Sequence, residues 1–147
     1  MKKLTTAKLL LASLTLVAGS AMAAQGTVYK SPYCGCCKEW VKYMEDNGYE
    51  MEVVNMENLN PIKAKLGLRP QLASCHTAVI DGYVFEGHIP VEDINSFLAK
   101  KPKLAGLAVP GMPMGSPGME YGNQKDAYNV LGFTKAGMTM VYSKHNQ

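Results

Sequence analysis

The sequence predicts an α/β domain in which helices flank a central mixed sheet, followed by a C-terminal methionine-rich loop and a β-hairpin. Three observations predict this fold class. Strand-like segments alternate with segments of helical periodicity along most of the chain. Asp81-Gly82 separates two runs rich in β-branched and aromatic residues, a pattern typical of a hairpin. Three clustered cysteines directly follow the first predicted strand.

The first 23 residues have the pattern of a secretory signal peptide. Three lysines precede an apolar run at residues 9–17, and Ala21-Met22-Ala23 has the form of a cleavage site. The run is well short of the roughly 20 residues that cross a bilayer, which argues against a membrane anchor. Because this segment holds three lysines and no acid, the net charge of +3 falls to zero after cleavage. We therefore expect an exported, soluble periplasmic protein, cleaved after Ala23, without the basic surface that binds nucleic acid.

The first half of the remaining chain alternates strands and helices. The predicted elements are strands at 26–30 and 49–56, helices at 36–47 and 60–68, and a hairpin at 76–88. In the first helix Trp40, Tyr43 and Met44 recur at helical spacing before Gly48 ends the segment. Pro61 suits the first turn of the second helix.

The second half adds a helix and another hairpin. A helix is predicted at 90–101 because one face collects apolar residues, namely Val91, Ile94, Phe97 and Leu98. A hairpin at 126–144 turns at residues 135–137. The order strand, helix, strand, helix, hairpin, helix, with cysteines at the first strand-to-helix junction, is typical of a thioredoxin-like fold. We expect one such domain over residues 24–147, with the C-terminal extension beginning at about residue 103.

The cysteine spacing indicates chemistry rather than cross-linking. The four cysteines are Cys34, Cys36, Cys37 and Cys75. An even number in an exported protein usually means structural disulfides, but adjacent Cys36 and Cys37 bridge each other only with strain, and such short loops remove little unfolded-state entropy. A helix N-terminus beside Cys34 favours the thiolate, which is both nucleophile and metal ligand. Redox exchange across the C-x-x-C pair Cys34 and Cys37 and metal binding both remain open.

Cys75 and His88 are expected to face the motif. In thioredoxin-like proteins the segment before the third strand faces the cysteines, and here it reads Ser74-Cys75-His76. Cys75 then completes a four-sulfur pocket, with His88 at its rim. Neighbours in a strand point to opposite faces, so His76 is equally compatible with a core position. His145, close to the C-terminus, is predicted to be frayed and exposed.

Soft ligands of this kind bind copper(I) or zinc. A structural zinc site draws its cysteines from two separated knuckles, which the adjacent Cys36 and Cys37 fit poorly. Copper(I) accepts two or three sulfurs, and thiolates bridge several ions, so the crowded motif favours more than one copper ion.

Methionines add a second group of sulfur atoms. The Pro- and Gly-rich loop at residues 108–120 carries Met112, Met114 and Met119, whose thioethers bind copper(I) and are not lost to disulfide formation. Packing is the alternative role for each of them. Met138 and Met140 alternate onto one face of the last hairpin, and a core, a copper-facing surface and an interface are all compatible with that face.

The segments SPYCGCCKEW, SCHTAVIDGYVFEGHIP and GLAVPGMPMGSPGME, in this order, resemble the CopG family of periplasmic copper-resistance proteins. The resemblance extends from about residue 26 to about residue 120. It implies a thioredoxin-like fold, an envelope location, association with copper-efflux systems, and copper held in a cysteine-bridged cluster. Carried over to this sequence, the cluster thiolates are Cys34, Cys36, Cys37 and Cys75.

We therefore expect a periplasmic copper-binding protein of copper resistance or homeostasis. Whether it also has copper-linked redox activity is left open by the sequence. Its expected ligands are the four cysteines and His88, with secondary ligands Met112, Met114, Met119 and His76. The alternative is an envelope thiol-disulfide oxidoreductase with Cys34 as nucleophile and Cys37 as resolving cysteine. A zinc-stapled structural module is a third hypothesis. Copper-efflux or copper-carrier proteins are the expected partners, and no hydrolase or transferase signature is present.

Overall fold

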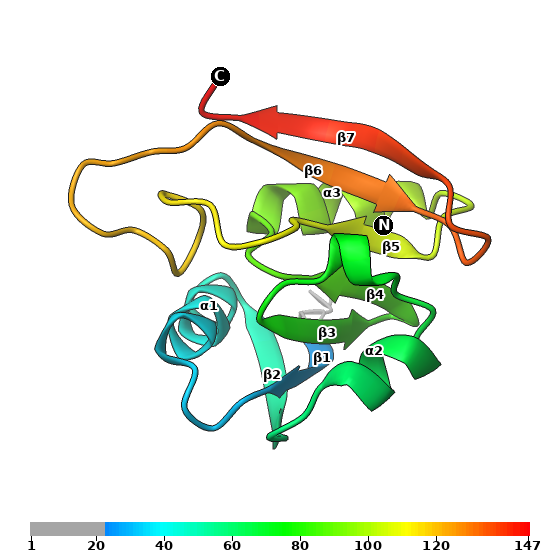
Figure 1. Ribbon diagram of the computed structural model, residues 1–147, viewed down its shortest axis with the longest axis horizontal. Helices are drawn as coiled ribbons and strands as arrows, with labels where there is room; N and C mark the ends of the chain where they lie inside the picture. The colour runs from blue at the N-terminus through cyan, green and yellow to red at the C-terminus, as the bar shows by residue number, and fades with distance from the viewer. Residues whose placement is uncertain (1–22) are drawn as a thin grey trace, which may run out of the picture.

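A seven-stranded mixed sheet forms the centre of the structure (Figure 1). The computed structural model describes residues 23–147, so the predicted signal peptide lies outside the described residues apart from Ala23. The elements in chain order are β1 (Ala24–Lys30), α1 (Gly35–Asp46), β2 (Tyr49–Asn55), α2 (Asn60–Lys65), the 3-10 helix η1 (Pro70–Leu72), β3 (His76–Ile80), β4 (Tyr83–Glu86), α3 (Val91–Lys100), β5 (Gly106–Ala108), β6 (Tyr128–Phe133) and β7 (Thr139–His145).

The strand order is β2-β1-β3-β4-β5-β6-β7. β1 is parallel to β2 and antiparallel to β3, and β3 forms the predicted hairpin with β4. Asp81 and Gly82 both have positive φ, 50° and 77°, as a two-residue hairpin turn of this kind requires. The predicted strands and both hairpins are therefore confirmed, with small shifts at their ends.

The second helix is shorter than predicted. α2 ends at Lys65, because Gly67 adopts a φ of +75° and the backbone turns back on the helix. The Leu68 N–H donates to the Lys63 carbonyl and the Gly67 N–H to the Ala64 carbonyl, both at 3.0 Å. This pattern is a glycine-terminated helix end that satisfies the last carbonyls. The prediction that the helix continues to residue 68 was wrong because the apolar spacing carries on past the glycine.

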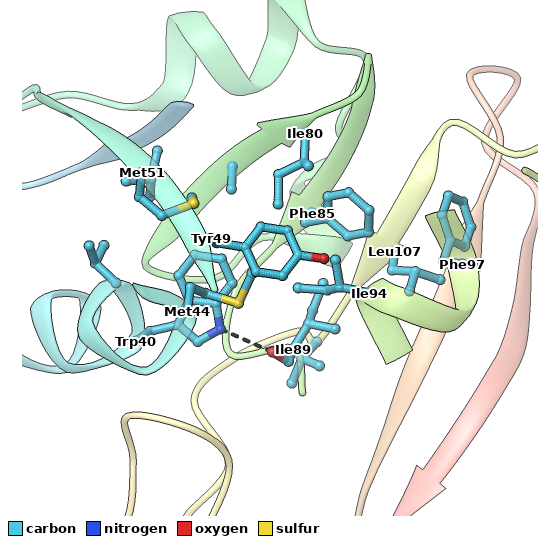
Figure 2. Close-up of a cluster of buried hydrophobic side chains, with 14 of the residues drawn as sticks. Trp40, Met44, Tyr49, Met51, Ile80, Phe85, Ile89, Ile94, Phe97 and Leu107 are labelled. Carbon is cyan, nitrogen blue, oxygen red and sulfur yellow. Dashed lines mark hydrogen bonds between the residues drawn. The ribbon is translucent and has the colours of Figure 1, made fainter. Parts of the chain in front are cut away.

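The main core lies between the sheet and helices α1 and α3 (Figure 2). Trp40 from α1, Phe85 from β4, and Ile94 and Phe97 from α3 are fully buried there. Trp40 Nε1 donates a hydrogen bond to the carbonyl of Ile89 at 3.0 Å, drawn as the dashed line in Figure 2. This contact holds α1 against the segment that follows β4.

The opposite face of the sheet carries a second cluster. Side chains alternate across a strand, so Val84 points away from its neighbour Phe85 and packs with Leu68, Leu72 and Phe133. Both faces of β4 are therefore buried. Within residues 23–147, no helix has the length and apolarity needed to cross a bilayer.

The chain beyond residue 103 continues the sheet. β5, which the sequence did not predict, pairs in parallel with β4 and joins the β6–β7 hairpin to the rest of the sheet. A Cβ on Gly106 would lie 1.7 Å from the Val84 carbonyl oxygen, so the two strands meet closely only because residue 106 is glycine. A three-residue strand that contains glycine has too little periodicity for sequence analysis to detect.

The prediction that His145 is frayed and exposed was wrong. His145 pairs with Tyr128 across the β6–β7 ladder. The two rings are stacked, with their centroids 5.1 Å apart. His145 Nε2 lies 2.7 Å from the Asp93 carboxylate at the start of α3. Strand pairing therefore reaches nearly to the C-terminus and ties it to a helix.

Candidate metal centre

The N-terminus of α1 presents the C-x-C-C motif. Cys34 is the N-cap of the helix, with extended backbone, and its sulfur accepts a hydrogen bond from the Cys37 N–H at 3.3 Å. A cap usually uses an oxygen from Ser, Thr, Asp or Asn, and here sulfur takes that position. Cys36 and Cys37 follow in the first turn, Cys36 half-buried and Cys37 fully buried. The positive end of the helix dipole therefore faces the sulfurs.

The structure brings all four cysteines together, as expected. β3 lies beside β1, so Cys75, the residue just before β3, comes to face the motif at the end of β1. Cys36 Sγ is 3.8 Å from Cys75 Sγ and 3.5 Å from Cys34 Sγ. The four sulfurs lie within 4.8 Å of one another. We call Cys34, Cys36, Cys37 and Cys75 the cysteine cluster.

Two members of the cysteine cluster are oxidised and two are free. Cys34 and Cys37 form a disulfide, whereas Cys36 and Cys75 are half-buried thiols. Burial, followed by the neighbouring Cys36, raises the pKa of the Cys75 thiol to about 12. At neutral pH without a metal Cys75 is therefore protonated. Four thiolate ligands require reduction of the disulfide and loss of the thiol protons.

His88 lies beneath the surface, and its predicted place at the pocket rim was wrong. The segment after β4 turns inward and leaves the side chain fully buried. Its Nε2 is 3.0 Å from Cys75 Sγ, and its Nδ1 is 2.8 Å from the Pro117 carbonyl oxygen. A carbonyl only accepts hydrogen bonds, so Nδ1 carries the proton and the lone pair of Nε2 faces the sulfur. Burial lowers the pKa of His88, so the ring is neutral, as a metal ligand must be.

His76 also contacts Cys75. Its Nδ1 lies 3.5 Å from Cys75 Sγ, and the two share with His88 a second group of donor atoms within 4.8 Å. The expectation that neighbours point to opposite faces fails here because Cys75 precedes the first residue of β3. Burial holds the pKa of His76 well below its ordinary value. Its Nε2 is buried without a hydrogen-bond partner among the described residues.

The methionine-rich loop reaches the site through its backbone. The Pro117 carbonyl holds His88, and the Gly111 carbonyl accepts a hydrogen bond from Ser74 Oγ at 2.5 Å. A Cβ on Gly118 would lie 2.8 Å from the Cys36 carbonyl oxygen, so the loop packs directly on the motif.

The methionine side chains differ in exposure. In the loop Met119 is buried at 9% exposure, Met114 is half-buried and Met112 is 52% exposed. On the last hairpin Met138 and Met140 are 68% and 56% exposed, which excludes a core role for them.

A buried polar group that the sequence did not predict lies behind Cys75. Glu86 and Thr77 are fully buried, and the Glu86 carboxylate pairs with Lys63 of α2. Burial raises the pKa of Glu86, although Lys63 opposes the rise. The available signal was Glu86 itself, an acid that follows three apolar or aromatic residues in β4.

Comparisons with known proteins indicate the family to which this chain belongs. A family model described as a protein of unknown function, DUF411, matches residues 72–119. A comparison with curated protein sequences found no match. A solved structure of copper resistance protein CopG, Form 1, is 42% identical with a TM-score of 0.80, and the match covers 85% of this chain and 99% of that one. Form 2 is 43% identical with a TM-score of 0.79, over 83% and 98% of the two chains. The chain therefore belongs to the CopG family of copper resistance proteins.

Proposed function

We propose that this protein binds copper(I) as a cysteine-bridged cluster of more than one ion in the periplasm and so contributes to copper resistance. The observation that carries the proposal is the gathering of four sulfurs within 4.8 Å of one another. The similar solved structures are described as copper resistance proteins. Thiolate sulfur and imidazole nitrogen form a donor set that suits copper(I).

The arrangement of the sulfurs favours a cluster over a single ion. Cys36 and Cys37 are adjacent at the start of α1, and two neighbouring residues reach the corners of one tetrahedral zinc site poorly. Cys36 Sγ lies 3.5 Å from Cys34 Sγ and 3.8 Å from Cys75 Sγ. A thiolate in that position is placed to bridge ions bound by its neighbours. His88 supplies a neutral nitrogen 3.0 Å from Cys75 Sγ.

We also propose that the fold is thioredoxin-like and that the signal peptide is cleaved. A thioredoxin-like core is supported by the β2-β1-β3-β4 order and by the packing of α1 and α3 in one core. Residues 1–23 act as a cleaved signal peptide, and residues 24–147 form the mature domain with its extension. Copper-efflux or copper-carrier proteins of the envelope are the proposed partners. The loop residues Met112, Met114 and Met119 are proposed as secondary ligands, with His76.

Anaerobic titration of the reduced mature protein tests the proposal. Copper(I) is added in competition with a chelator of known affinity, and bound metal is counted per chain. We expect more than one tightly bound copper(I). The matched control is the same protein with the Cys34–Cys37 disulfide intact, which should bind less copper because two sulfurs are withheld. Uptake of one ion or none by the reduced protein contradicts the proposal, and stoichiometric zinc with unfolding on chelation supports a zinc-stapled module instead.

Copper affinity is expected to fall as the pH falls. The pKa of the Cys75 thiol is raised to about 12, so Cys75 is a thiol at neutral pH and must release its proton to bind as thiolate. Each proton released changes the apparent binding constant by about ten-fold per pH unit. Competition titrations between about pH 6 and pH 8, with proton release followed in weak buffer, measure this slope. A binding constant that does not vary with pH contradicts thiolate ligation.

A second candidate function is redox chemistry, and the Cys34–Cys37 disulfide favours it. Oxidation of the two thiols to this disulfide releases two electrons and two protons, and the electrons reduce two copper(II) ions to copper(I). Exchange with a protein dithiol uses the same pair. Retention of disulfide exchange after both Cys36→Ser and Cys75→Ser supports an oxidoreductase, whereas loss of copper uptake in those variants supports the cluster.

A further inference from the structure

A buried polar cluster lies behind the segment that carries Cys75. It consists of Lys63 from α2, Thr77 from β3 and Glu86 from β4. The Glu86 side chain is 0% exposed and that of Lys63 is 11% exposed. None of these three residues is a proposed copper ligand. We call them the Lys63–Thr77–Glu86 cluster.

The carboxylate of Glu86 is oriented by several donors. Its Oε1 accepts hydrogen bonds from Lys63 Nζ and, at 2.6 Å, from the backbone N–H of Ser74. Its Oε2 accepts from Thr77 Oγ1 at 2.5 Å. Lys63 Nζ also donates to Thr77 Oγ1 at 2.9 Å. The carboxylate therefore has a single orientation, with one oxygen facing the peptide that leads to Cys75.

Ser74 is held on its other sides as well. Its Oγ donates to the Gly111 carbonyl at 2.5 Å. A Cβ on Gly87 would lie 2.6 Å from Ser74 Cβ and from the Val109 carbonyl oxygen, so a glycine is needed for this close packing. The residue before Cys75 is thus fixed by its N–H, its hydroxyl and its packing. This peptide leads directly to Cys75, whose Sγ lies 3.8 Å from Cys36 Sγ and 3.0 Å from His88 Nε2.

Stability alone does not account for a buried ion pair. Removing two charges from water costs about as much as their attraction returns, and apolar residues of similar size often replace such a pair without loss. An apolar residue at position 86 would, however, leave the Ser74 N–H without its acceptor. We propose that Glu86, oriented by Lys63 and Thr77, is a positioning residue that fixes Cys75 against Cys36 and His88. The positioning is a property of the apo protein, and its importance for copper rests on the proposed function.

Thiol–disulfide equilibrium measures this positioning without copper. In a Cys34→Ser/Cys37→Ser background, the hydroxyl introduced at position 34 can still cap α1, and Cys36 and Cys75 are the remaining thiols. Oxidised glutathione converts these two thiols to a disulfide and is itself reduced to two molecules of glutathione. The equilibrium constant of this exchange with glutathione gives the effective concentration of one protein thiol in the neighbourhood of the other. Urea unfolding of the reduced protein measures stability separately.

The decisive variant replaces the whole cluster by apolar residues of similar size, Lys63→Met, Thr77→Val and Glu86→Leu. We expect the fold to be retained, because no charge is left unpaired, and the effective concentration to fall about ten-fold or more, because Cys75 is displaced. Glu86→Gln keeps an acceptor oxygen but weakens the bond to Ser74, since a neutral acceptor binds less strongly than an ionised one. Its expected loss is smaller, about three-fold.

Asp93→Asn is the matched control, because it alters another polar contact of low exposure, the one between Asp93 and His145, which makes no hydrogen bond to the cysteines. It should lower stability and leave the effective concentration unchanged. An unchanged value in the folded triple variant overturns the positioning role. If the triple variant does not fold, Glu86→Gln decides, and an unchanged value there overturns the role equally.

A copper titration of the variants with all four cysteines separates this inference from the proposed function. We expect the folded triple variant to bind copper(I) about 10- to 100-fold more weakly than the natural chain. If the natural chain takes up no copper, the proposed function fails, while the glutathione equilibrium still decides the role of Glu86. If affinity is unchanged although the effective concentration has fallen, the positioning has no importance for copper and that part of the inference is overturned.

Discussion

Cys75→Ser is expected to abolish multinuclear copper uptake while leaving the fold intact. Cys75 Sγ lies between Cys36 Sγ at 3.8 Å and His88 Nε2 at 3.0 Å, so it connects the motif to the imidazole. Serine has a similar shape, but its hydroxyl oxygen is a hard ligand that copper(I) disfavours. We expect copper(I) affinity to fall by more than about 100-fold, beyond the loss typical of residues that only support a ligand.

The measurement is the anaerobic copper titration with metal analysis, performed on the natural chain and the variant side by side. Met138→Ser and Met140→Ser are the controls, because each removes an exposed sulfur from the last hairpin. Both should retain the copper stoichiometry of the natural chain. Undiminished uptake by Cys75→Ser contradicts a four-cysteine cluster. Weak uptake of one ion or none by both proteins favours the Cys34–Cys37 pair as the functional unit.

Trp40→Ala is expected to cause the largest loss of stability among the substitutions considered. The indole is 0% exposed and sits in the main core. Truncation of a buried tryptophan to alanine costs about 3–5 kcal/mol. Trp40 also donates to the Ile89 carbonyl, next to His88, and lies 4.5 Å from the His76 ring. The variant should therefore loosen both histidines that contact Cys75.

Urea unfolding followed by circular dichroism measures the loss, because Trp40 is the chain's one tryptophan and its removal also removes that fluorescence signal. Trp40→Phe should lose less, about 1–3 kcal/mol, since it keeps an aromatic ring but leaves the Ile89 carbonyl without its donor. Tyr33→Ala is the control from the same motif, because Tyr33 is 84% exposed. Its effect should stay within about 0.5 kcal/mol. A loss below about 1 kcal/mol in Trp40→Ala would contradict the packing described for it.

Much of the fold could be predicted from local patterns. Asp81-Gly82 predicted a hairpin because few residue pairs adopt the two positive φ angles that the turn requires. The spacing of Trp40 and Met44 predicted the buried face of α1. β5 could not be predicted, since its three residues form a strand only by pairing with β4 and β6. Strand order across the C-terminal half likewise depends on contacts between distant segments.

Some features of the candidate site could likewise be predicted from the sequence, and others could not. The proximity of Cys75 to Cys34, Cys36 and Cys37 was predicted from the order of elements, and the structure places them together. Their roles as copper ligands remain a prediction. The sequence placed His88 at the rim, whereas its depth depends on the loop at Pro117, which packs over it. The contact of His145 with Asp93 depends on strand pairing that no short segment predicts.

By itself the sequence determined which atoms are available and which local elements carry them. Residue type and short-range periodicity predicted three sulfurs at the start of a helix, a fourth before a hairpin, and a glycine-rich loop. These signals depend only on residues close together in the chain. Only the tertiary structure decided that Cys34 and Cys37 are joined, that His88 is buried and neutral, and that Glu86 holds the peptide before Cys75. The physical reason is that burial and long-range hydrogen bonds arise between segments far apart in the chain, and these contacts set proton positions and donor geometry.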